Sequence, residues 1–431
     1  MIPKNRSLSS RSLSLGSRNS LRRLRPQRSY NSGRNLLSNT SSTITTPEPV
    51  ILPKKIDFLR RLPFELGAYI VSLLDFQSLL AVSCVSKIWR QHYLSKDQWR
   101  FRILERNWKL KAPSSLNVEE YQVDWYYWFK QRYQLETRWR LGKVAAHYLD
   151  GHLQGVYCVQ FDDQKIVTGS RDTTIKIWDA RSYQCIRTLA GHEGSVLCLN
   201  YDDRTMVSGS SDTTLIVWNL HNLKNIMRLR GHTAGISGVC FDDRCIISSS
   251  KDNTIRIWNF ADGAPIRVIT GHSGPVNSIQ LKGNHLVSVS GDGLIKLWNI
   301  LSGNCIRMFS GHTGGLTCVQ FDGRRIVSGA SDHTIKVWDA ETGKCLLTCE
   351  GHTNLVRSLH VQDNTIISAS YDETMRVWDL RTGECLLCYQ SGHTSWIFDV
   401  YFDQKKIVSV SQDKRILVMD FSEGLDTRFF A

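Results

Sequence analysis

The dipeptide Gly-His occurs seven times in this chain of 431 residues, at an almost fixed interval. The copies begin at residues 151, 191, 231, 271, 311, 351 and 392, so five intervals are 40 residues and the last is 41. A Trp-Asp or Trp-Asn pair follows 27 residues later in the first six units, and Met419 stands in its place in the seventh. A period this strict indicates a repeat architecture of seven units, each too small to bury its apolar faces alone.

Within each unit, short β-branched and aromatic runs alternate with turns of Asp, Gly and Ser, which is the pattern of hairpins. In the first unit the runs are 156–161, 166–170, 174–178 and 185–189. Together with the two dipeptide series, they resemble the WD-repeat family, whose units are four-stranded blades of a β-propeller. The resemblance implies an all-β, seven-bladed propeller over residues 143–431, which is a binding platform with many uses.

A polar set recurs with the same period. Each unit has a turn aspartate and, four residues before it, a hydroxyl: Thr168 and Asp172, Ser208 and Asp212, Ser248 and Asp252, Ser288 and Asp292, Ser328 and Asp332, Ser368 and Asp372, Ser409 and Asp413. With the histidine, one such set would suggest a hydrolase triad. Seven copies favour a structural device, and the family resemblance implies a buried chain from Asp through His and hydroxyl to the indole. The seventh blade lacks the indole donor, so we expect it to be the softest.

Two segments compete to complete the seventh blade. Residues 145–149 and 426–430 both align with the outermost strand at 185–189. We expect the N-terminal segment to do so, because joining the two ends of the ring resists unravelling.

The net charge of +14 is uneven along the chain. Residues 1–55 carry +10, residues 56–150 carry +5, and the propeller carries −1. The high pI therefore reports a basic, Ser/Arg-rich tail, which we expect to be disordered, and it does not indicate a nucleic-acid-binding propeller. Four interpretations of the tail remain open. It could carry sites of basic-directed kinases, a nuclear import patch at 22–28 or a mitochondrial transit peptide, or it could be a solvated segment without a discrete role.

Seven of the twelve cysteines recur at two blade positions, namely Cys185, Cys305, Cys345 and Cys385 at one and Cys158, Cys198 and Cys318 at the other, which favours small core residues in a reducing compartment, the cytoplasm or nucleus. Cys385 and Cys388 have C-x-x-C spacing, but no second pair stands at a zinc-ligand distance. No apolar run approaches 18 residues, so no membrane span is expected. We expect no metal and no cofactor.

Residues 56–102 read as compact helices, because leucines recur at helical spacing from Leu62 and again from Leu79. The segment resembles the F-box, most clearly in the run Val85-Ser86-Lys87-x-Trp89-Arg90. Residues 103–142 then form a helical connector with an aromatic stripe, which is usually core. The stripe is Tyr121, Trp125, Trp128, Phe129, Leu135 and Trp139.

An F-box followed by a helical connector and a WD propeller resembles the substrate receptors of Skp–cullin–F-box ubiquitin ligases. The resemblance implies that the F-box binds a Skp-type adaptor, and through it a cullin, that the propeller holds target proteins, and that the chain itself is not catalytic. The adaptor-binding candidates are Leu62, Pro63, Leu66, Ile70, Leu79, Val82, Val85 and Trp89. The alternative is a WD-repeat scaffold outside the ligases, whose helices serve packing or dimerisation.

In related ligases, targets lie on the propeller face formed by two repeating positions. Blades six, seven and one hold aromatics and arginines there, which are typical of binding hot spots. The predicted target site is Tyr157, Arg171, Arg357, Tyr371, Trp396, Phe398 and Gln412. Blade seven separates Arg171 from Arg357, and Lys251 lies on the polar side of the ring, so we expect Lys251 to matter less. Whether the target is phosphorylated stays open.

Overall fold

The computed structural model describes residues 57–106, 108, 124–390, 392–428 and 430. The basic tail predicted at 1–55 lies outside the described residues, and so does Tyr121 of the aromatic stripe. The chain divides into two compact units, 1–58 and 59–431, and the domains described below belong to the second.

Short helices come first. They are η1 (Phe58–Arg60), α1 (Phe64–Ser72), α2 (Phe76–Val82), α3 (Lys87–Leu94), α4 (Lys96–Glu105) and α5 (Trp125–Leu141). Asp75 caps α2 by accepting a hydrogen bond from the Ser78 N–H, and Gly142 ends α5 at a φ of 63°, where a glycine is favoured. The boundary predicted between residues 102 and 103 falls inside α4.

One buried cluster holds α1 to α4 together. Val71, Leu79, Trp99 and Ile103 are at most 2% exposed, and Phe129 of α5 joins them with no exposed surface. Gly67 of α1 makes the packing possible, since a Cβ there would lie 2.8 Å from the His92 ring. Aromatic residues of α5 therefore complete the core of the helical domain.

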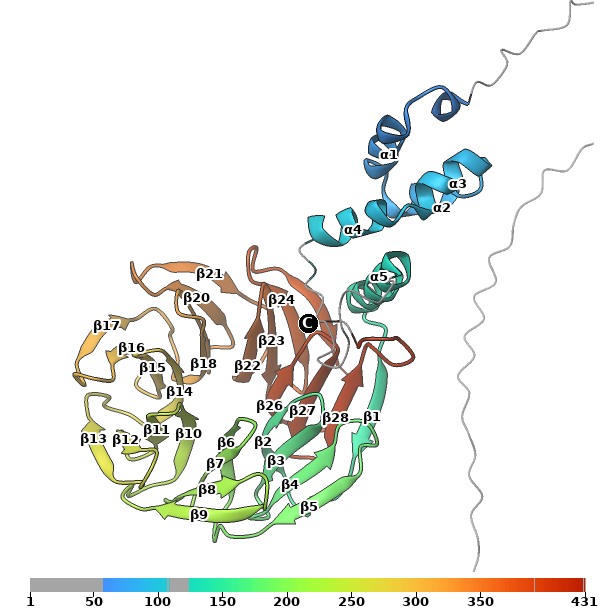
Figure 1. Ribbon diagram of the computed structural model, residues 1–431. Helices are drawn as coiled ribbons and strands as arrows, with labels where there is room; N and C mark the ends of the chain where they lie inside the picture. Colours follow the sequence, from blue (N-terminus) through green and yellow to red (C-terminus); the bar gives the residue numbers. More distant parts are fainter. Residues whose placement is uncertain (1–56, 107, 109–123, 391, 429, 431) are drawn as a thin grey trace, which may run out of the picture. The chain divides into compact units, whose positions relative to one another are not determined.

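The propeller consists of 28 strands in seven four-stranded antiparallel sheets arranged in a ring (Figure 1). Blades one to three are β2 (Val156–Phe161), β3 (Lys165–Ser170), β4 (Ile175–Asp179) and β5 (Cys185–Leu189); β6 (Val196–Tyr201), β7 (Thr205–Ser210), β8 (Leu215–Asn219) and β9 (Lys224–Leu229); and β10 (Ile236–Phe241), β11 (Cys245–Ser250), β12 (Ile255–Asn259) and β13 (Pro265–Ile269).

Blades four to seven follow the same order. They are β14 (Val276–Lys282), β15 (His285–Ser290), β16 (Ile295–Asn299) and β17 (Cys305–Phe309); β18 (Leu316–Phe321), β19 (Arg325–Ala330), β20 (Ile335–Asp339) and β21 (Cys345–Cys349); β22 (Val356–Gln362), β23 (Thr365–Ser370), β24 (Met375–Asp379) and β25 (Cys385–Tyr389); and β26 (Ile397–Phe402), β27 (Lys406–Ser411) and β28 (Ile416–Asp420), completed by β1 (Ala145–Leu149). The seven-bladed fold predicted from the repeats is confirmed.

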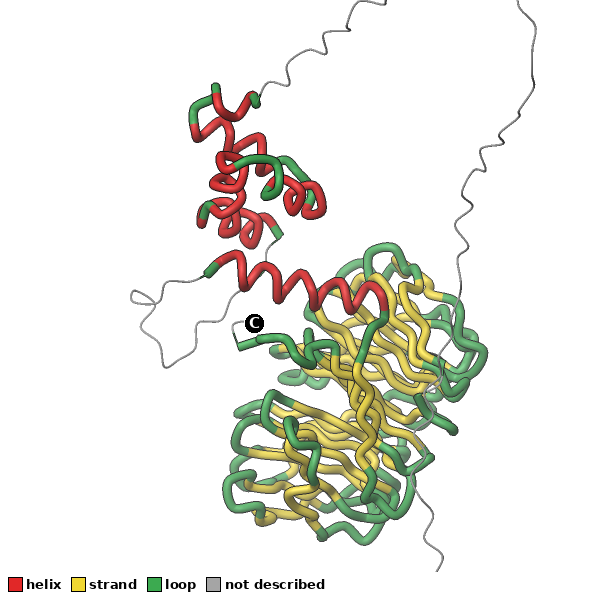
Figure 2. Tube along the Cα trace, turned by 90° about the vertical axis from the view of Figure 1, so that its right-hand side faces the viewer, coloured by secondary structure: helices red, strands yellow, loops and turns green. Residues whose placement is uncertain are grey.

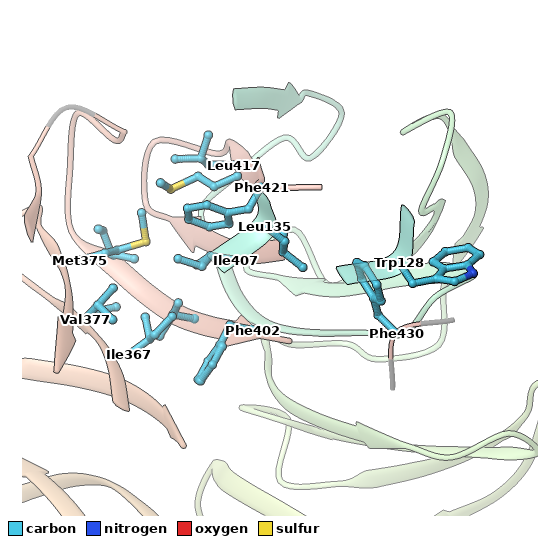
Figure 3. Close-up of a cluster of buried hydrophobic side chains, with 14 residues drawn as sticks. Trp128, Leu135, Ile367, Met375, Val377, Phe402, Ile407, Leu417, Phe421 and Phe430 are labelled. Atoms are coloured by element: carbon cyan, nitrogen blue, oxygen red, sulfur yellow. The ribbon is translucent and has the colours of Figure 1, made fainter. Parts of the chain in front are cut away.

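The ring closes with the N-terminal strand. β1 pairs antiparallel with β28 from Ala145 opposite Asp420 to Leu149 opposite Ile416, as expected. The competing C-terminal segment packs on α5 instead. The Asp426 N–H donates to Gln131 Oε1 at 3.2 Å, and Phe430 meets Trp128 edge to face at 6.3 Å, as Figure 3 shows.

The C-terminal half of α5 contacts blade seven. Trp139 stacks on Phe421 with ring centroids 3.9 Å apart, and its indole N–H donates to the Gln404 carbonyl oxygen at 2.9 Å. Leu135 joins a buried cluster with residues of blades six and seven (Figure 3). Figure 2 shows that the chain leaves this helix directly into a strand of the propeller. The connector predicted from its aromatic residues therefore contributes to both the helical core and the propeller core.

Candidate functional site

The recurring polar set forms a hydrogen-bonded chain in every blade. The His Nδ1 to Asp Oδ2 distances are 2.7–3.0 Å, the His Nε2 to hydroxyl distances are 2.7–2.9 Å, and in blades one to six the indole nitrogen lies 2.8–3.0 Å from the hydroxyl. Since an ionised carboxylate only accepts, the imidazole carries its proton on Nδ1 and accepts from the hydroxyl. All seven hydroxyl residues have no exposed surface, so no substrate reaches them and the chains are structural.

The chains keep their aspartates ionised. At Asp252, burial acts to raise the pKa, but hydrogen bonds from the Thr254 hydroxyl, the Thr233 N–H and His232 outweigh it and lower the pKa to about 2. Burial also lowers the pKa of His232 below 6.5, although Asp252 opposes this change. The His232–Asp252 pair is therefore a neutral imidazole on a carboxylate at neutral pH.

A cavity of about 440 Å³ opens at the centre of one propeller face. The innermost strand of every blade contributes to it: Tyr157, Leu197, Ser237, Asn277, Thr317, Arg357 and Phe398. The turns add Arg171, Lys251, Tyr371, Trp396 and Gln412. All seven residues predicted for the target site thus lie around one opening, which we call the mouth cavity.

Aromatic side chains form one wall of the mouth cavity. Tyr371 stacks on Trp396 with ring centroids 4.7 Å apart and planes at 7°, and Phe398 lies 5.9 Å from Tyr371 and 4.7 Å from Tyr157. Trp396 is 45% exposed although it is a large apolar residue. This wall is the predicted sector of blades six, seven and one, and it can bury an apolar side chain of a partner.

Cations line the rest of the mouth cavity without any carboxylate among its lining residues. Arg171, Lys251 and Arg357 all face it, and no described residue accepts a side-chain hydrogen bond from them at the distances found in this structure. Lys251 reaches the same opening from blade three, among the polar residues Ser237 and Asn277, and its smaller contribution stays a prediction. With no carboxylate in the lining itself, the three cations favour an anionic ligand, although the charge of Arg357 also acts on Asp399 deeper in the channel.

A carboxylate lies deeper in the central channel. Asp399 accepts hydrogen bonds from the Ser358 hydroxyl at 2.6 Å and from the Val159 N–H at 2.9 Å, and so connects blades six, seven and one. Removal from bulk water raises its pKa, while the Ser358 bond and the charge of Arg357 oppose the rise. This residue was not predicted from the sequence. Its signal was a carboxylate at a strand position that is Cys, Ser or Gly in the other six blades.

The helical domain has an exposed apolar face. Along one side of α1 and at its end, Leu66, Tyr69 and Leu73 are 51–69% exposed. Val85, which follows α2, is 59% exposed, and Phe64, 52% exposed, stacks on His92 with ring centroids 4.4 Å apart. Of the predicted adaptor-binding residues, Pro63, Leu66 and Val85 are exposed, and Leu62, Ile70 and Trp89 are half-buried. Large apolar residues left in water at this density mark a protein-binding surface.

Two of the predicted adaptor contacts need correction. Leu79 is 0% and Val82 is 3% exposed, because α2 turns them into the helical core. These two side chains pack in the core beneath the exposed residues and do not present surface to a partner in this structure. Phe64 and Tyr69 were not among the predicted adaptor-binding residues. The signal for them was that α1 carries apolar residues on all sides, whereas a helix that only packs on a core needs them on one side.

The comparisons with known proteins agree with this architecture. The family described as WD domain, G-beta repeat matches residues 143–179, 183–219, 223–259, 263–299, 303–339 and 343–379, and the F-box domain family matches residues 59–101. The chain therefore belongs to the WD-repeat family. It is an F-box/WD-repeat protein, whose seventh blade, with Met419 in place of the tryptophan, is found in the structure but not among the six matched repeats.

Curated relatives include fungal ligase subunits. A "Probable E3 ubiquitin ligase complex SCF subunit sconB" of Arthroderma otae is 32% identical over 31% of this chain and 24% of that protein. A "Probable E3 ubiquitin ligase complex SCF subunit scon-2" of Neurospora crassa is 27% identical over 31% of this chain and 32% of that protein. The matches thus span about a quarter to a third of the length of these relatives. The crystal structure of the computationally designed Ika8 protein has a TM-score of 0.54 and 30% identity, over 63% of this chain and 98% of that one.

Two absences hold for the described part of the chain. No helix there is long and apolar enough to cross a membrane. No group of three or more His, Cys, Asp or Glu residues there has the geometry of a metal site.

Proposed function

We propose that this protein is the substrate-recognition subunit of a Skp–cullin–F-box ubiquitin ligase. The observation that carries the proposal is the presence of two protein-binding surfaces in one chain. The apolar face of α1 fits a helical adaptor, and the mouth cavity fits a target. The names of the fungal relatives, which are ligase subunits, support the same role.

In this role the chain performs no chemistry. It holds a target near the ubiquitin-charged enzyme, and so raises the effective concentration of the reacting groups. The adaptor binds the exposed apolar face, and a cullin is reached through the adaptor. Cys158, Cys198 and Cys318 recur at a buried blade position as free thiols, which supports a reducing compartment, the cytoplasm or nucleus. The core position expected for Cys185, Cys305, Cys345 and Cys385 is wrong, because the outermost strand exposes them.

The mouth cavity suggests the chemistry of the target. Arg171, Lys251 and Arg357 would bind carboxylate or phosphate groups, each through a charge-assisted bond of about 1.5–3 kcal/mol. The wall of Tyr371 and Trp396 would hold an apolar side chain beside that anion. We therefore propose acidic or phosphorylated segments of target proteins as ligands, and we propose neither nucleic acid nor membrane as a partner.

The experiment is a purification of the full chain with its partners from cells. The wild type should retain a Skp-type adaptor and a cullin, and Leu66→Asp with Leu73→Asp should lose both. Ile266→Asp with Val268→Asp is the matched control, since these residues are 56% and 45% exposed on the outer strand of blade three. Absence of the adaptor from the wild type would favour the scaffold alternative.

A further inference from the structure

A second cavity, of about 360 Å³, lies between α4 and α5 and shares no residue with the mouth cavity. Its walls come from two helix faces. Arg102 lies on the last turn of α4 and Arg106 caps that helix, and Tyr133, Thr137 and Arg140 follow one face of α5. Asp75, Phe76 and Glu136 complete the lining. We call it the helix cavity.

The two carboxylates of the helix cavity are already occupied. Asp75 accepts from the Ser78 N–H at 2.9 Å and from the Ser78 hydroxyl at 2.7 Å. Glu136 accepts from the Trp108 indole at 2.8 Å and from Arg106 at 3.1 Å. These hydrogen bonds come from Ser78, Trp108 and Arg106 and not from Arg102 or Arg140, although the charge of Asp75 acts on Arg102.

Those two arginines keep unused donors. Arg102 is only 6% exposed, and its Nη2 donates to the carbonyl oxygens of Val71, Ser72 and Leu74 at the end of α1. Its Nε is buried without an acceptor among the described residues. Arg140 is exposed, and no described residue accepts a hydrogen bond from its guanidinium. A buried donor left unpaired costs about 1–3 kcal/mol, so a ligand that accepts from Arg102 Nε would recover that free energy.

Thr137 adds a third unused group. Its hydroxyl is buried without a partner among the described residues, on the α5 wall between Tyr133 and Arg140. A hydroxyl beside two guanidinium groups is a donor set suited to a phosphate, whose oxygens accept several hydrogen bonds at once.

We propose that the helix cavity binds a phosphate group through Arg140, Arg102 and Thr137. Arg140 makes the first contact from the exposed rim, and Arg102 lies deeper. The phosphate belongs either to a small polyphosphate compound or to a phosphorylated side chain. Because Arg102 also holds the end of α1, the ligand ties α1 and α4 to α5, the helix that continues into β1. This inference does not depend on the proposed ligase function.

The test is isothermal titration of the full chain with two probes, sodium tripolyphosphate and a phosphoserine tetrapeptide. Arg171→Gln, Lys251→Gln and Arg357→Gln are present throughout, so that the mouth cavity does not contribute. Arg140→Gln is then introduced into this background. Lys130→Gln is the matched control, because Lys130 lies on the same helix but outside the cavity lining. We expect one equivalent of at least one probe to bind, weakened at least tenfold by Arg140→Gln and less than twofold by Lys130→Gln.

Which probe binds identifies the source of the phosphate. Binding of neither probe would overturn the proposal, as would an equal effect of the two α5 variants. Thr137→Val supplies a second measurement, because it removes the hydroxyl and keeps the shape. This substitution should weaken the affinity for the probe at least threefold without lowering the melting temperature of the free protein. Unchanged affinity in both Thr137→Val and Arg140→Gln would also contradict the site.

Discussion

Tyr371 and Trp396 stack face to face, with planes at 7° and centroids 4.7 Å apart, although they belong to different blades. Tyr371 follows the second strand of blade six, and Trp396 precedes the first strand of blade seven. The stack places a flat aromatic wall beside Arg357 in the mouth cavity. The proposed target site therefore depends on the packing of neighbouring blades, because the two rings of the stack come from blades six and seven.

The cations of the mouth cavity should act together. Reversing Arg171 and Arg357 to Glu should weaken target binding more than tenfold, because each lost charge-assisted bond is worth about 1.5–3 kcal/mol and repulsion is added. Lys251→Glu alone should also weaken binding severalfold, since it lines the same opening. Binding of purified targets by titration measures this. Unchanged affinity in Lys251→Glu would restrict the site to blades six, seven and one.

The aromatic wall should contribute through apolar contact. Trp396→Ala should cost about 2 kcal/mol or more in target binding, which is typical of a central aromatic anchor. Leu301→Ala is the control, since Leu301 is 63% exposed outside the cavity. The same titration at low and high salt separates the two effects, because the loss from Trp396→Ala should not depend on salt. A salt-dependent loss would mean that Trp396 acts only by orienting the arginines.

The polar chains should affect stability alone. His272→Ala should destabilise the protein by about 1–3 kcal/mol, because Asp292 and Ser288 lose a partner in the buried chain. Urea unfolding measures the change. If the variant unfolded like the wild type but lost target binding, the structural assignment of the chains would be wrong.

The stability of the fold should fall as the pH falls below neutrality. Burial lowers the pKa of five chain histidines below 6.5, namely His152, His192, His232, His272 and His312, and it lowers the pKa of His360 to about 4. Between pH 6.5 and those lower values the unfolded chain binds more protons than the folded one. Linkage then removes about 1.4 kcal/mol per pH unit for each extra proton.

The aspartates extend this loss to lower pH. The pKa of Asp172 and of Asp212 is about 2 in the folded protein, against 3.8 ordinarily, so their contribution is complete above pH 3.8 and disappears as the pH falls towards 2. Urea midpoints should therefore drop between pH 7.5 and 5, and drop further below pH 4. A constant midpoint from pH 7.5 to 5 would contradict neutral, buried histidines.

The fold could be predicted from the sequence because the same pattern recurs in all seven units. The strands expected at 156–161 and 185–189 match β2 and β5 to the residue. The closing strand was also predicted correctly. The lower stability expected for blade seven stays a prediction. Trp139 of α5 stacks on Phe421 and so supplies this blade with a tryptophan contact from outside its own repeat.

The surfaces could be predicted only in part. Apolar spacing in residues 56–102 identifies a helical domain, but it does not say which side faces inward. Leu79 and Leu66 look equivalent in sequence, yet one is 0% and the other 51% exposed. The contribution of Lys251 stays a prediction, because it lines the same cavity as the arginines but from blade three.

The measurement that tests the receptor account most directly is a comparison of the proteins stabilised by two variants in cells. One variant disables the adaptor face, with Leu66→Asp and Leu73→Asp, and the other disables the mouth cavity, with Arg171→Glu, Lys251→Glu and Arg357→Glu. Protein half-lives are measured across the proteome in each. If one chain delivers a target from the cavity to the adaptor, the two variants should lengthen the half-lives of the same proteins. Two non-overlapping sets, or no change in either variant, would contradict the account.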